Sequence, residues 1–313
     1  MRARALALAA LLVMGCRHAP GSSGGDRSLP RPVREGKTLL DSGQLDAALA
    51  ELLKTPDDPD SLYYQGRVWA KKAESAPLPT APPPPSPTPR GWQPPPAPEL
   101  KPEEGQAIAL YEKAIAARPE AAEPHLALAQ LLAPHAAHQY DLEQEGAKHK
   151  KPSAPPAETP VASVDRVIRA YQFAMQADPA STVPVEELIR FGRRVGRWDA
   201  AEAGFKEMLR RKKERETAEP LVKYGDFLAD EKKDPLAAIE QYRQALIWTP
   251  DDDATRNKVA DVYLKMGTEA FVKQQYAVAE DRFNDAAKYI TDRSSPRAQA
   301  LGEYQARLRA MRH

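Results

Sequence analysis

Apolar residues recur at helical spacing in paired stretches along most of the chain, and the clearest pair lies within residues 182–215. Val185, Leu188 and Ile189 form one apolar stripe before Gly196, which suits the left-handed turn that ends a helix. A second stripe follows this glycine, formed by Trp198, Ala201, Phe205, Met208 and Leu209. Neither short helix can bury its stripe alone, so the pattern predicts a helical hairpin that packs against further hairpins.

Further copies of the second helix share one spacing of small, aromatic, small and proline positions. The copies are Ala107, Tyr111, Ala114 and Pro119; Val167, Tyr171, Ala174 and Pro179; and Ala238, Tyr242, Ala245 and Pro250. The small residue lets two helices approach, the aromatic ring fills the space one turn later, and the proline ends the helix. The pattern therefore predicts a chain built from repeated helical hairpins.

This spacing resembles the tetratricopeptide repeat, a helix-turn-helix unit of about 34 residues. The resemblance implies an all-α, right-handed solenoid of about six repeats over residues 31–290, within a domain that spans 31–313. Residues 296–313 carry apolar positions at helical spacing and are expected to form a capping helix. The alternative interpretation is an unrelated bundle of alanine-rich helices, which would not require a fixed repeat.

Two insertions interrupt the repeat. Ala48, Ala107 and Val167 hold matching positions in successive units, and each interval between them exceeds one repeat by roughly 25 residues. The insertions cover about 76–99 and 134–160 and contain proline-rich runs, so both are expected to be disordered. Each falls between the first and second helix of its unit, which predicts that both emerge from one edge of the solenoid.

The amino terminus has the features of an export signal. Arg2 and Arg4 precede an apolar run of about 11 residues, Ala5 to Gly15, which is too short to span a bilayer. The run ends at Cys16 and resembles a bacterial lipoprotein signal, which implies a signal peptide at 1–15, lipidation of Cys16 and a flexible tether at 16–30. Arg17 after the cysteine favours, by the same resemblance, the outer membrane. The alternative is an ordinary secretory signal that is cut elsewhere.

Charge and cysteine content limit the possible partners. Lys and Arg total 45 against 44 for Asp and Glu, so no overall field favours nucleic acid. The single cysteine excludes a disulfide within the chain. Contact with a membrane is therefore expected through the N-terminal lipid, and the other partner is expected to be a protein or peptide of the cell envelope.

The family resemblance also implies a binding face. In tetratricopeptide repeats the first helix of each unit lines a concave groove. Matching the units places seven residues there: Lys37, Tyr63, Arg67, Lys71, Arg190, Arg193 and Arg194. The lysine and asparagines with which one subclass grips a carboxyl terminus are missing from the matching positions. The alternative for the arginines is a solvated helix face.

Little in the sequence points to catalysis. No nucleophile motif, phosphate-binding loop or cysteine pair occurs, and no cofactor is expected. His135 and His138 form an H-x-x-H pattern, but this lies in the second insertion and is expected to be a solvated loop. We therefore expect a periplasmic, outer-membrane-anchored interaction scaffold that is not an enzyme. The alternatives are an assembly factor of a pilus or secretion machine, similar to a secretin pilotin, and a metal-dependent hydrolase using these histidines.

Overall fold

The computed structural model describes residues 29–76, 100–148, 162–213 and 216–311, and every regular element in these ranges is a helix. The thirteen helices of the described residues confirm the all-α prediction. They are α1 (Arg31–Asp41), α2 (Leu45–Leu52), α3 (Pro59–Ser75), α4 (Pro102–Ala117), α5 (Ala122–Lys148), α6 (Val164–Ala177), α7 (Val183–Arg194), α8 (Trp198–Arg211), α9 (Ala218–Asp230), α10 (Pro235–Trp248), α11 (Asp253–Val272), α12 (Tyr276–Ala287) and α13 (Pro296–Ala310).

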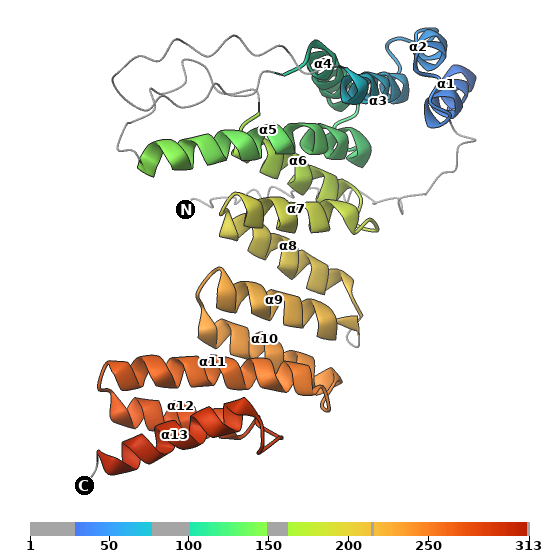
Figure 1. Cartoon of the computed structure of the whole chain (residues 1–313). Coiled ribbons are helices and arrows are strands. Elements are labelled where there is room, and N and C mark those ends of the chain that lie inside the picture. The colour runs from blue at the N-terminus through green and yellow to red at the C-terminus, as the bar shows by residue number, and fades with distance from the viewer. Residues whose placement is uncertain (1–28, 77–99, 149–161, 214–215, 312–313) are drawn as a thin grey trace, which may run out of the picture.

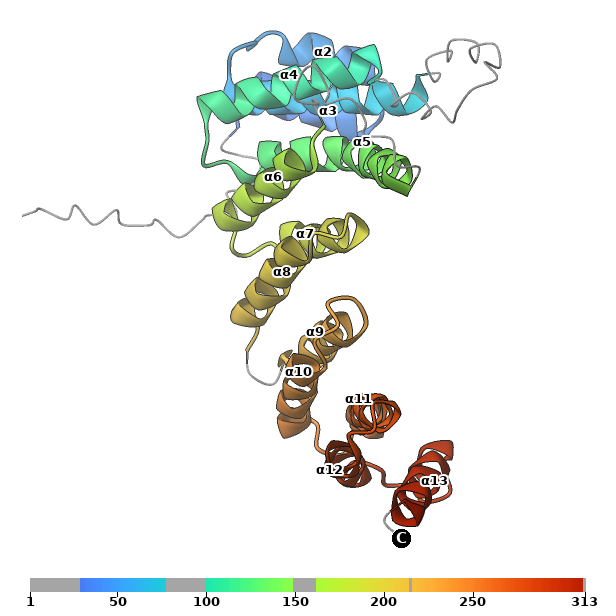
Figure 2. The same ribbon diagram turned by 90° about the vertical axis from the view of Figure 1, so that its left-hand side faces the viewer.

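Consecutive helices pair as antiparallel hairpins that stack into an elongated solenoid (Figures 1 and 2). The six hairpins run from α1–α2 to α11–α12, which confirms the predicted number of units. The helix α13 covers the last hairpin, with Leu301 and Leu308 buried and Tyr304 stacked on Phe283. The described part of 296–313 therefore caps the apolar end of the solenoid.

Close approach within a hairpin depends on a glycine that faces a ring. A Cβ atom added at Gly66 would lie 2.6 Å from the ring of Tyr111, and one added at Gly225 would lie 2.5 Å from Tyr242. In the α7–α8 hairpin the second helix also supplies a glycine, since Ile189 of α7 packs against Gly204 of α8. A glycine at the crossing is therefore common to these hairpins, and the α7–α8 hairpin has one on each helix, Gly192 and Gly204.

The turn that the sequence placed at Gly196 is confirmed, since this residue has a φ of +65° between α7 and α8. The turn that precedes α7 is held by an acid and not by a hydroxyl. Thr182 precedes this helix but makes no capping hydrogen bond, and Asp178 instead accepts from the amides of Ala180 and Ser181. Asp178 therefore holds the turn between α6 and α7, ahead of the first residue of α7.

The predicted loop over 134–160 is wrong for its first part, because α5 continues through Pro134 to Lys148. Leu132 and Ala136 are buried on either side of this exposed proline, and Tyr140 packs against the same core. Tertiary packing therefore outweighs the local cost of a proline inside a helix. Residues 149–161, like 77–99 of the first insertion, lie outside the described residues.

The basic side chain of Arg211 links neighbouring units of the solenoid. Only 9% of the Arg211 side chain is exposed, and its guanidinium donates to the Met175 carbonyl at 2.6 Å and to the Ser181 carbonyl. This side chain ties the end of α8 to the turn between α6 and α7. The unpaired carbonyls at a helix end are natural acceptors for such a donor.

Candidate binding hollow between α3 and α5

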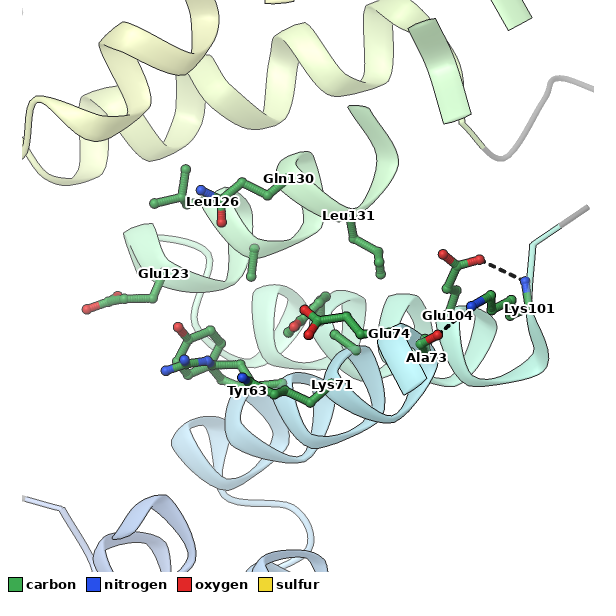
Figure 3. A pocket seen from close by; sticks show the side chains of 14 residues that line it. Tyr63, Lys71, Ala73, Glu74, Lys101, Glu104, Glu123, Leu126, Gln130 and Leu131 are labelled. Carbon is green, nitrogen blue, oxygen red and sulfur yellow. Dashed lines mark hydrogen bonds between the residues drawn. The ribbon is translucent and has the colours of Figure 1, made fainter. Parts of the chain in front are cut away.

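A hollow of about 570 Å³ opens between α3 and α5, with the start of α4 at one end (Figure 3). We call it the α3–α5 hollow. It is lined by Tyr63, Arg67, Ala70, Lys71, Ala73, Glu74, Lys101, Glu104, Tyr111, Glu123, Leu126, Ala127, Gln130 and Leu131. Its walls come from the second and third hairpins, so a single repeat cannot form it.

The α3 wall presents one face of a helix to the hollow. Tyr63, Arg67, Lys71 and Glu74 follow one another at spacings of four, four and three residues, which places them along one side. The opposite side of α3 is apolar and buried, with Val68 fully enclosed. Core packing of α3 therefore fixes the direction of its polar face.

The α5 wall lies opposite and combines polar and apolar groups. Glu123, Leu126, Gln130 and Leu131 line the hollow from α5, and Leu131 points toward the side of Glu74 (Figure 3). Leu126 and Leu131 are half-buried, whereas Glu123 and Gln130 are exposed. The wall thus offers apolar surface, one carboxylate and one amide to whatever enters.

Lys101 closes the α4 end of the hollow. Its Nζ donates to the Ala73 carbonyl at 2.6 Å and to the Ala76 carbonyl at 2.8 Å, and its backbone amide donates to Glu104 at 2.8 Å. The other carboxylate oxygen of Glu104 lies 3.1 Å from Nε2 of His135 on α5. A lysine at a helix C-terminus also suits the helix dipole, so this end is a structural junction.

Four charged residues of the hollow form no ion pair with any residue that the structure describes. Arg67, Lys71, Glu74 and Glu123 have no ion-pair partner within 4.0 Å in the part of the chain that the structure describes. Burial raises the pKa of Tyr63 to about 12, against the opposing effect of the Arg67 guanidinium. Burial also raises the pKa of Tyr111, so both hydroxyls are neutral donors and acceptors at neutral pH.

A smaller recess continues the hollow past Tyr63 and Glu123, which line both. Its other lining residues include Leu29 and Asp60, and Asp60 accepts two hydrogen bonds from Arg118 at 2.9 and 3.1 Å. Together the recess and the hollow follow α3 from Asp60 to Glu74, a distance of about 21 Å at 1.5 Å per residue.

The structure brings together three of the seven predicted groove residues, Tyr63, Arg67 and Lys71. The other four lie elsewhere and are paired. Lys37 lies 3.7 Å from Asp41 on α1, and Arg190 donates to Glu187 at 2.8 Å. Arg193 donates to Glu231, and Arg194 to Asp141, each at 2.8 Å.

The pairs of Arg193 and Arg194 link α7 to its neighbours on both sides. Asp141 belongs to the part of α5 that was expected to be a loop, so sequence reasoning could not supply this partner. The Arg194 guanidinium holds the pKa of Asp141 below its usual range. Exposed pairs of this kind contribute at most about 1 kcal/mol, so they align neighbouring units more than they stabilise them.

Sequence reasoning missed Glu74, Glu123, Leu126 and Gln130 as lining residues. A signal was available, since Leu126 and Gln130 match the positions of Tyr63 and Arg67 in the next unit. Leu126 and Gln130 carry neither a positive charge nor an aromatic ring, the two features by which the groove residues were predicted.

Both histidines of the H-x-x-H pattern lie on α5 and not in a loop. His135 contacts Glu104, and within the described ranges no three His, Cys, Asp or Glu side chains gather as a metal-ion site would require. None of the helices described is both long and apolar enough to span a bilayer.

Comparison with known proteins gives the fold. No family model and no curated protein matches the sequence. A chain in the complex of Naa15/Naa10 bound to HypK-THB has a TM-score of 0.52 at 12% identity, over 90% of this chain and 33% of that one. This chain therefore spans about one third of that protein's length.

Two further solved structures are shorter. YrrB, a TPR protein with an unusual peptide-binding site, has a TM-score of 0.40 at 16% identity, over 72% of this chain and 88% of that one. The structure of pilF from Pseudomonas aeruginosa has a TM-score of 0.32 at 13% identity, over 81% of this chain and 91% of that one. The helices of this chain form a solenoid of tetratricopeptide-like hairpins, and the structure with the TM-score of 0.52 shares this fold.

Proposed function

We propose that this protein is an interaction scaffold and that its α3–α5 hollow takes an extended segment of a partner protein. The observation that carries the proposal is the lining of the hollow. Apolar side chains, an amide and four charged side chains that form no ion pair within the described ranges line one open channel between two repeats. Extended chain advances about 3.3 Å per residue, so the length of α3 from Asp60 to Glu74 suits about six residues.

Filling the hollow with a larger side chain tests this proposal. We expect Gln130→Trp to weaken binding of peptides selected from a random octapeptide display library on the purified full chain by at least about tenfold, because the indole would occupy the channel. Gln244→Trp is the matched control, since Gln244 is an exposed glutamine on α10, far along the solenoid. A selection that yields no binding peptide, or peptides that ignore Gln130→Trp, would contradict the proposal.

We further propose that the scaffold is anchored to the outer membrane on its periplasmic side through a lipid on Cys16. This residue lies outside the described residues, and the support is the apolar run that ends in Gly15 and Cys16. A diacylglyceryl group on the sulfur of this cysteine supplies two acyl chains, the apolar area that stable anchoring requires.

Cys16→Ser is expected to move the protein from the membrane fraction to the soluble fraction of the envelope. The checks are fractionation and mass spectrometry of the N-terminal peptide, with Ser22→Ala as a control that leaves the cysteine intact. Retention of the variant in the membrane fraction, with no lipid on the wild-type peptide, would refute the anchor.

A further inference from the structure

Resting on the proposed function of the α3–α5 hollow, we infer that it selects segments with one carboxylate between apolar residues and rejects runs of acids. Three features of the hollow carry it: two cations at its centre, two carboxylates that bracket them, and apolar surface on the facing wall.

The central cations are Arg67 and Lys71. They lie one helical turn apart on α3, a rise of about 6 Å, so one carboxylate can contact both. Elsewhere in the described chain Arg193, Arg194 and Arg197 each pair with a carboxylate of a neighbouring helix. Among the residues that the structure describes, Arg67 and Lys71 have no such partner. Arg67 is half-buried, so an incoming carboxylate would supply an opposite charge.

Carboxylates of the protein bracket this pair. Glu74 follows Lys71 by one turn on α3, and Glu123 lies near Tyr63 at the other end of the hollow (Figure 3). A second or third acid on the ligand would lie one to two residues from the first, and therefore closer to Glu74 or Glu123. Like-charge contact would then oppose binding, which limits the favoured ligand to one acid.

The facing wall determines what surrounds this acid. Leu126, Ala127 and Leu131 of α5 are half-buried along the channel, and Tyr63 offers its ring from α3. Apolar side chains of an extended ligand would remove this surface from water. Exposed Gln130 lies among them and can both donate to and accept from a peptide backbone.

The test uses peptides selected from the random library on the purified full chain. We expect them to carry a single Asp or Glu between apolar residues. Replacing that acid by its amide should weaken binding about tenfold, because one charge-assisted contact is lost. The same loss is expected for the acid peptide on Arg67→Gln/Lys71→Gln, and affinity should fall with added salt.

Two variants distinguish charge from folding. Selection on Arg67→Glu/Lys71→Glu should exchange the acid of the peptides for Lys or Arg, a gain that an unfolded variant cannot produce. Selection on Glu74→Gln/Glu123→Gln should admit peptides with several acids. Unchanged helicity by circular dichroism is required of both.

The outcomes separate the two proposals. Peptides that Gln130→Trp blocks but that lack an acid, or that carry acid runs on the wild type, would overturn the inference and leave the proposed function standing. A selection that yields no binding peptide would contradict both the proposed function and the inferred preference for one acid.

Discussion

Tyr242→Ala is expected to lower the free energy of unfolding by about 3–5 kcal/mol, the usual cost of removing a buried aromatic side chain. Tyr242 is 2% exposed, and its ring lies directly against Gly225 of the preceding helix. Gly225 has no side chain with which to fill the space that the ring leaves. Urea unfolding followed by far-UV circular dichroism measures the loss.

Tyr242→Phe separates the ring from its hydroxyl. The hydroxyl donates to Asp226 at 2.7 Å, and the same carboxylate lies 2.6 Å from Lys258 of α11. Because Asp226 keeps its lysine, the phenylalanine variant is expected to lose only about 1 kcal/mol. A loss below about 1 kcal/mol in Tyr242→Ala would mean that the ring does not carry the packing of this hairpin.

Gly192→Ala is expected to destabilise the protein by about 1–2 kcal/mol, the net of a steric cost and a smaller gain in helix propensity. A Cβ atom at this position would lie 2.8 Å from the backbone nitrogen of Ala201 and 3.0 Å from the Arg197 carbonyl oxygen. Backbone atoms at the start of α8 cannot rotate away as a side chain would, so α7 and α8 must separate. The better helix propensity of alanine offsets this by less than about 1 kcal/mol.

Gly302→Ala is the matched control, since Gly302 also lies inside a helix but has no atom within 4 Å of an added Cβ. It is expected to stabilise the protein by roughly 0.5–1 kcal/mol, through helix propensity alone. Thermal and urea midpoints of the two variants should therefore move in opposite directions. Equal shifts would show that the contact between α7 and α8 yields to a methyl group.

The hairpin repeat could be predicted because its causes are local in sequence. A small residue such as Ala107, an aromatic such as Tyr111 and a proline such as Pro119 recur at fixed spacing and set the register and end of each second helix. The interval from Ala238 to Ala279 is longer than one repeat, which indicates a longer first helix in the last unit, and α11 spans Asp253–Val272. Periodicity over one or two turns is enough for such predictions.

The tertiary structure alone decided how far α5 extends and which charges are paired. Pro134 signals a helix end locally, but Ala136 and Tyr140 find a core on the neighbouring unit, and burial outweighs the local signal. That extension gives Arg194 its partner Asp141. Arg67 and Lys71, which are basic like Arg194, instead line an open channel. A sequence shows which side of a helix carries a charge. The presence of an opposite charge across the gap depends on how neighbouring units stack, which many weak contacts over distant residues decide together.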